Sequence, residues 1–184
     1  MLKKYLVVFA AIAAVFAFAS CNPDEDVEKK GHAIDHLELR INPEYPQTAI
    51  DNFDLHYSVL QDGKSLSSGT MTGDYTPLEV TSGITGGRIE VSLTFTAKES
   101  FRSSFQPFTD YYLSEHTFIG LYAIREDGTE SELISFEHDL SGSNFSTFTV
   151  EKIPEAIAMM EDYLAVSDAF TLKKNRNGEY DITF

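Results

Sequence analysis

The sequence predicts an antiparallel β-sandwich with one short helix in the C-terminal half of the chain. Three observations predict this class. Apolar residues recur at every second position over most of the chain after residue 33, turn-forming residues separate these runs, and only one stretch changes to helical spacing. Eight or nine such strands suit a sandwich or a barrel, since both are built from many short strands with regular turns.

Period-two alternation predicts the strands with one buried face. Leu37, Leu39 and Ile41 alternate with polar residues, and residues 53–59 repeat the pattern. The alternation is clearest over residues 89–97, where the apolar positions are Ile89, Val91, Leu93, Phe95 and Ala97. Because successive side chains of a strand point to opposite faces, each of these runs predicts a half-buried strand.

Turn residues predict how the strands pair. Asp62-Gly63 and Asp127-Gly128 each lie between strand-like runs, and Asp-Gly favours a two-residue hairpin because Gly accepts a positive φ. Residues 117–124 are apolar on both faces, which predicts a central strand, and residues 133–136 are expected to pair back onto it. Residues 145–150 predict a further strand.

The period changes near the C-terminus. Ile153, Ile157, Met160 and Leu164 follow helical spacing, and Pro154 suits a first helical turn, so we expect a helix over residues 154–165 laid on the sheet. A closing hairpin is expected after it, because residues 170–174 and 180–184 flank Asn175-Arg176-Asn177-Gly178.

Two architectures fit this order of elements. The first is a sandwich of roughly immunoglobulin- or transthyretin-like form. The alternative is a lipocalin-like β-barrel, because a late helix after a run of strands also suits that fold. The chain contains no Trp, so the Gly-x-Trp signature of lipocalins cannot be present, which favours the sandwich.

Cys21 is the only cysteine and follows a short apolar run at the N-terminus. Lys3 and Lys4 precede the run, and the small residues Ala19 and Ser20 precede Cys21, as in a cleaved secretory signal. The uncharged residues 5–20 are fewer than the roughly 20 that span a bilayer. We therefore expect cleavage before Cys21 and anchoring by two or three acyl chains attached to it.

The segment around Cys21 carries a resemblance to a known class of proteins. Phe18-Ala19-Ser20-Cys21 resembles a bacterial lipobox, with Phe18 where most have Leu. Together with the following Asn22-Pro23-Asp24-Glu25-Asp26, it resembles surface-exported lipoproteins of the Bacteroidetes group. The resemblance implies a lipid anchor in the outer membrane, with the acidic cluster as a signal for display on the cell surface. The periplasmic face of that membrane is the alternative location.

This segment also sets the expected domain organisation. Residues 1–20 are a lipoprotein signal peptide, residues 21–32 an acidic tether, and residues 33–184 a single β-rich domain. Removal of residues 1–20, with Lys3 and Lys4, changes the formal charge from −15 to −17. Such a surface repels nucleic acid, so we expect no nucleic-acid partner. Once Cys21 is acylated, no thiol is left for a disulfide or a metal site.

The segment from residue 99 to 116 is where aromatic residues gather outside a clean strand. One hypothesis is an exposed platform for a sugar ring or a protein partner, and the other is a loop or short helical turn that plugs the core. The helical spacing of 101, 105, 108 and 112 favours the plug, although Pro107 would interrupt a continuous helix. The candidate ligand-binding residues are Phe101, Phe105, Phe108, Tyr111 and Tyr112.

Other chemistry finds little support in the sequence. His32, Asp35 and His36 are close together, but their spacing at the start of a strand puts them on no common face. The acidic residues near predicted turns follow ordinary turn preference, and no EF-hand loop or hydrolase motif is present. We therefore expect no cofactor, no metal and no catalysis.

The expected function is that of a lipid-anchored binding or accessory protein at the cell surface, as a subunit or ligand-binding component of an outer-membrane complex. Its partners would be the membrane, through the lipid on Cys21, and an outer-membrane protein or a glycan. The alternatives are a carrier of a small apolar ligand and an adhesin-like glycan-binding module.

Overall fold

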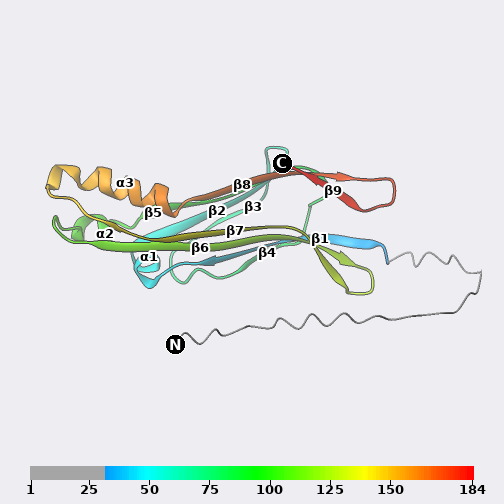
Figure 1. The fold of residues 1–184 in the computed structure, drawn as a ribbon, viewed down its shortest axis with the longest axis horizontal. Coiled ribbons are helices and arrows are strands. Elements are labelled where there is room, and N and C mark those ends of the chain that lie inside the picture. The colour runs from blue at the N-terminus through cyan, green and yellow to red at the C-terminus, as the bar shows by residue number, and fades with distance from the viewer. Residues whose placement is uncertain (1–31) are drawn as a thin grey trace, which may run out of the picture. The chain divides into compact units, whose positions relative to one another are not determined.

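A computed structural model of the chain describes residues 32–184, in which nine strands form two antiparallel sheets (Figure 1). The first sheet has the strand order β4-β1-β6-β7, and the second has the order β3-β2-β5-β8-β9. The predicted antiparallel β-sandwich is confirmed, and the two sheets do not close into the alternative barrel. Cys21 and the acidic residues at 24–26 lie outside the described residues.

The strands and helices follow one another along the chain in a simple order. The strands are β1 (Ile34–Glu44), β2 (Phe53–Gln61), β3 (Lys64–Met71), β4 (Leu78–Val80), β5 (Gly87–Ala97), β6 (Tyr111–Arg125), β7 (Glu130–Phe145), β8 (Val166–Lys174) and β9 (Tyr180–Thr183). The helices are α1 (Gln47–Asn52), α2 (Glu99–Ser104), a 3₁₀ turn (Val150–Lys152) and α3 (Ile153–Leu164).

The core lies between the sheets and comes from the alternating apolar positions. On β1 and β5 every apolar residue expected to face inward is at least nine-tenths buried. β6 adds Ile119, Leu121 and Ala123, all with no exposed surface. Because each inward side chain removes apolar area from water, this interior is the main source of stability in a domain that has no cysteine.

The predicted pairings are present. Asp62 and Gly63 have φ values of 50° and 74°, which is the backbone that a two-residue hairpin between β2 and β3 requires. β6 lies between β1 and β7, and Leu121 of β6 pairs with Ile134 of β7 across the Asp127-Gly128 turn. β8 and β9 form the closing hairpin.

Three expectations need correction. Residues 145–150 do not form a separate strand, because β7 runs on to Phe145 as the partner of Tyr111, and a 3₁₀ turn begins at Val150. Two six-residue helices, α1 and α2, were not predicted as helices in their own right. The predicted C-terminal helix is confirmed as α3, but it contacts β5 in one sheet and β6 in the other, so it covers one end of the sandwich.

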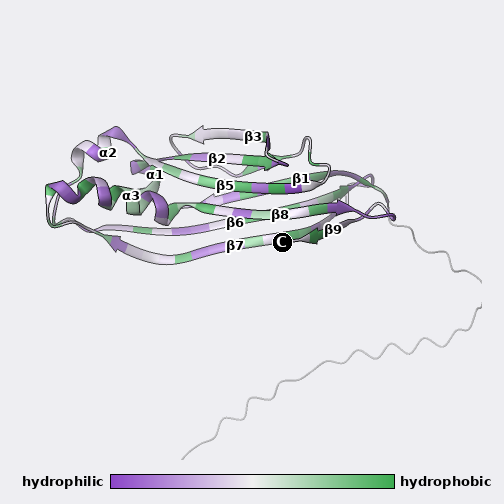
Figure 2. Cartoon of the chain, turned by 90° about the horizontal axis from the view of Figure 1, so that it is seen from above, coloured by the Kyte–Doolittle hydropathy of each residue, from purple (hydrophilic) through white to green (hydrophobic). Residues whose placement is uncertain are grey.

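The two ends of the domain are different. The three helices gather at one end, and both views agree on this (Figures 1 and 2). The described chain enters at the other end, where Ile34 pairs with Arg125 of β6. β6 joins the ends, and its fifteen residues span roughly 45 Å at about 3.3 Å per residue. We call the helical end the distal end.

None of the helices within residues 32–184 has the length and apolar character needed to cross a bilayer.

Candidate functional site

The aromatic segment divides into a buried part and an exposed part. Phe101 and Phe105 are each 3% exposed and belong to the core. The ring of Phe101 lies 5.3 Å from that of Phe53, and Phe105 stacks on Tyr111 at 4.4 Å. The hydroxyl of Tyr111 accepts a hydrogen bond from the backbone N–H of Gln106. Phe101 and Phe105 therefore plug the core, as one of the two hypotheses predicted, and the half-buried Tyr111 packs against them.

Phe108 points out of the distal end. Its side chain is 76% exposed, and its φ of 62° lies in the left-handed region, which a bulky residue rarely adopts. The backbone N–H of Phe108 donates to the carbonyl of Thr147 at 2.8 Å, which fixes two loops together. Beside it, the ring of Phe148 is 73% exposed and lies 5.8 Å away. We call Phe108 and Phe148 the distal aromatic pair.

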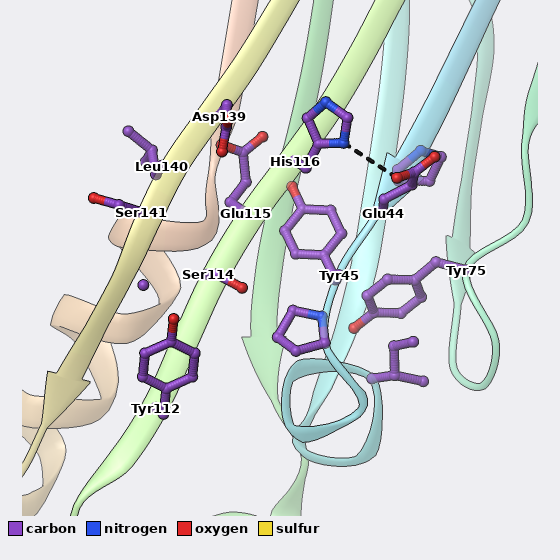
Figure 3. A pocket seen from close by; sticks show the side chains of 14 residues that line it. Glu44, Tyr45, Tyr75, Tyr112, Ser114, Glu115, His116, Asp139, Leu140 and Ser141 are labelled. Carbon is purple, nitrogen blue, oxygen red and sulfur yellow. Dashed lines mark hydrogen bonds and ion pairs between the residues drawn. The ribbon is translucent and has the colours of Figure 1, made fainter. Parts of the chain in front are cut away.

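Tyr112 belongs to a different feature, a cavity of about 640 Å³ on the first sheet (Figure 3). The cavity forms where β1 ends at Glu44, while β6 continues toward the distal end as far as Tyr111. The segment that leaves β1 supplies one wall, and the β6 and β7 residues supply the other. Tyr112, which is 54% exposed, lies against Gly142 at a β-bulge in the β6–β7 pairing.

Glu115 is the unusual residue of this cavity. It occupies an inward position of β6 and is 2% exposed, yet neither carboxylate oxygen has a hydrogen-bond partner. The neighbouring Thr117 hydroxyl donates instead to the Tyr45 hydroxyl at 3.1 Å, and Tyr45 donates to the carbonyl of Leu164 at 3.1 Å. Burial raises the pKa of Glu115, because the charged form loses its hydration. The Thr117 hydroxyl acts to lower the pKa of Glu115, but the effect of burial is larger.

His116, the next residue, faces the other side of β6. Its Nδ1 lies 3.1 Å from Glu44 and its Nε2 lies 3.2 Å from Glu137, so both nitrogens meet carboxylates. The hydrogen bond to Glu44, followed by that to Glu137, raises the pKa of His116. The pKa of Glu44 is lowered in turn by His116 and then by Asn42. His116 and Glu44 therefore form an ion pair over the pH range between their two pKa values.

The cavity as a whole is acidic. Three carboxylates line it, from Glu44, Glu115 and Asp139, and no Lys or Arg does so. His116 pairs with Glu44, whereas Asp139 makes no side-chain hydrogen bond or ion pair within residues 32–184. The remaining surface comes from aromatic and apolar side chains, among them Tyr45, Tyr75 and Ile50. This combination suits a positively charged ligand with an apolar body.

The other charged residues noted in the sequence have local partners. His36 Nδ1 lies 2.9 Å from Asp35, and His32 lies 3.6 Å from Asp127. Asp127 also accepts two hydrogen bonds from Thr129 within its own turn. In the described part of the chain, no three His, Cys, Asp or Glu side chains are arranged to hold a metal ion.

Sequence patterns point to some of these residues more than to others. Glu115 was missed, although the alternation of Leu113, Glu115 and Thr117 places it on the buried face once β6 is extended before residue 117. Phe148 was also missed, because only the folded chain brings it beside Phe108. No protein-family model, no curated protein and no solved structure matches this chain.

Replacing Glu115 by Gln should stabilise the domain at neutral pH. The unfolded Glu has an ordinary pKa of 4.5 and the folded one a raised pKa, so wild-type stability is full below pH 4.5 and falls as pH rises through the folded pKa. Glu115→Gln lacks this fall and should gain about 1–3 kcal/mol near neutral pH, with the gain shrinking in acid. Urea unfolding across pH measures it, and parallel pH profiles for the two proteins would contradict the assignment.

Replacing Phe108 by Gly should leave the domain at least as stable as the wild type. The left-handed backbone is strained by about 1–2 kcal/mol for Phe and is free of strain for Gly, and the exposed ring buries little area. Phe108→Val, with a β-branched side chain at the same φ, should destabilise. Thermal unfolding of the two variants compares them directly, and equal losses in both would show that the backbone is not under strain.

Proposed function

We propose that this chain is a lipid-anchored, non-catalytic binding or accessory protein at the surface of an outer membrane, where it serves as a subunit or ligand-binding component of a larger complex. The lipid anchor rests on Cys21 and its flanking residues. Surface display rests on the acidic run Asp24-Glu25-Asp26 behind it. The described domain adds a sandwich whose exposed aromatic residues, Phe108 and Phe148, lie far from the start of β1 at Ile34.

The observation that carries this proposal is that the described chain begins at the end of the sandwich opposite the distal aromatic pair. The chain enters the sandwich beside Arg125 of β6, while Phe108 precedes the first residue of the same strand. The two points are therefore separated by roughly the 45 Å length of β6. A domain held by its entry end would present Phe108 and Phe148 away from the membrane, where a partner can reach them.

The chemistry of the distal end favours a protein partner. Four large apolar side chains in the loops and helices of the distal end are more than half exposed: Phe108, Phe148, Val150 and Met159. Exposed apolar side chains that gather on one part of a surface mark interaction sites. Aromatic residues held in fixed positions are the usual anchors of protein interfaces. Asp110 and Glu151 follow the two rings closely in sequence, so the complementary surface would be an apolar pocket with basic residues around it.

Cys21→Ala should move the protein from the membrane to the soluble fraction, or block its processing, because the acyl chains would have no sulfur to attach to. Fractionation of cells followed by immunoblotting measures this. Unchanged membrane retention would contradict the lipid anchor. A variant with Asp24, Glu25 and Asp26 replaced by Asn, Gln and Asn is the matched control, since it should stay in the membrane but become protected from external protease on intact cells.

Replacing both members of the distal aromatic pair by Ser should abolish capture of a stoichiometric partner in a mild cross-linking pull-down from the native membrane. Loss of two aromatic anchors typically weakens an interface by about 4 kcal/mol or more. Phe184→Ser is the matched control, because Phe184 is 89% exposed but lies beside Phe136, away from the distal end. Equal recovery of the partner by the double variant would contradict the proposed contact.

A further inference from the structure

Tyr112 presents an exposed aromatic ring at one end of the cavity. The ring lies over Gly142, where a Cβ would come within 2.0 Å of the ring carbon Cζ, so any other residue at position 142 would displace the ring. The β-bulge places Ser141 and Gly142 opposite the single residue Ser114. Since Tyr112 is 54% exposed, the glycine and the bulge hold an aromatic surface that a ligand can reach.

The polar groups beside this ring lie on the outer face of the sheet. Tyr112 and Ser114 alternate along β6 with inward residues such as Glu115, which faces the interior and takes no part in this surface. Within residues 32–184 the hydroxyls of Tyr112, Ser114 and Ser141 make no hydrogen bond, and the carboxylate of Asp139 makes none either. Because each hydroxyl can both donate and accept, this surface suits a ligand that carries hydroxyls itself.

The other end of the cavity carries the charge. Asp139 pairs across the strands with His116, and both side chains lie on the outer face. The two ring nitrogens of His116 lie 3.1 Å from Glu44 and 3.2 Å from Glu137. Three carboxylates therefore surround one imidazole, and Asp139 is the one without a hydrogen-bond partner among the described residues. This end favours a positively charged group on the ligand.

The dimensions of the cavity suit two linked sugar rings. Tyr112 and His116 are four residues apart on β6, roughly 13 Å at about 3.3 Å per residue, with Ser114 between them (Figure 3). The volume of about 640 Å³ is typical of sites for small organic ligands. An extended peptide fits less well, because α1 contacts β6 and its Ile50 lines the same cavity, so a helix already lies at the edge to which another strand would add.

We propose that this cavity binds a short glycan with a free amino group, with one sugar ring stacked on Tyr112 and the ammonium of the glycan paired with Asp139. The C–H face of a sugar ring suits the electron-rich face of an aromatic ring. Sugar hydroxyls would supply partners for the hydroxyls of Ser114 and Ser141. This site goes beyond the function proposed above and uses other residues than the distal aromatic pair, so its ligand and the protein partner are tested independently.

Isothermal titration calorimetry tests the proposal on the chain that begins at residue 21, made soluble by Cys21→Ala. The probes are chitobiose with its free amines, N,N′-diacetylchitobiose and cellobiose, which share one skeleton and differ only in the group at C2 of each ring. The titrations are made at about pH 6, where amines of this kind are protonated. We expect chitobiose to bind and the other two to bind about tenfold more weakly, because only chitobiose can form a charge-assisted bond with Asp139.

Four variants make the result specific to the cavity, and thermal unfolding verifies that each is folded. Asp139→Asn should weaken chitobiose binding by about tenfold and leave cellobiose binding nearly unchanged. Tyr112→Ala should weaken all three disaccharides by about tenfold, whereas Tyr112→Phe, which keeps the ring, should retain most of the affinity. Gly142→Ala should act as Tyr112→Ala does, because the added Cβ displaces the ring.

The matched control is Glu126→Gln, which removes a charge from an exposed turn at the entry end and should bind as the parent chain does. Equal affinity for cellobiose and chitobiose would overturn the proposal, because the charge of Asp139 would then not select the ligand. Unchanged affinity in both Tyr112→Ala and Gly142→Ala would overturn it too, since the sugar would bind elsewhere. Absence of chitobiose binding would also overturn it, and Asp139-dependent binding of a blocked tripeptide with a central lysine would then assign the cavity to a basic peptide.

Discussion

The structure depends on the fact that β1 ends before β6 does at the distal end of the sandwich. β1 pairs with β6 only as far as Glu44 opposite His116, and the chain then turns through Tyr45 and Pro46 into α1. β6 continues toward the distal end with β7 as its one partner strand. This mismatch leaves one edge of β6 without a neighbouring strand, and that is where the cavity forms. The same extension of β6 carries the preceding aromatic segment to the far end of the sandwich.

The packing of the turn after β1 closes the core but does not satisfy every polar group. Tyr45 and Tyr75 pack edge-on at 5.7 Å, and their hydroxyls donate to backbone carbonyls at Leu164 and Phe53. These bonds fix the turn against α3 and β2. The Thr117 hydroxyl donates to Tyr45 in this arrangement, and both carboxylate oxygens of the buried Glu115 are left without a hydrogen-bond partner. Stability has thus been given up at one position of an otherwise well-packed interior, as is common at binding sites.

Local patterns predicted most of the sheet and little of the site. The alternation at residues 89–97 and the Asp-Gly turns are short-range signals, and the corresponding strands and hairpins are present. The prediction of a separate strand at residues 145–150 was wrong, because β7 continues to Phe145 as the partner of β6. Phe148 and Phe108 meet only through the contact of two loops, which no local pattern encodes. Glu115 follows the period of its strand, but whether a donor reaches it depends on tertiary structure.

The measurement that tests this account most directly is a carbon-detected NMR titration of the Glu115 side chain in the chain that begins at residue 21, made soluble by Cys21→Ala. We expect a pKa above the ordinary value of 4.5 in the folded protein, because burial removes the hydration of the charged carboxylate. An ordinary pKa in the folded protein would contradict it, because it would show that water or a donor reaches the carboxylate.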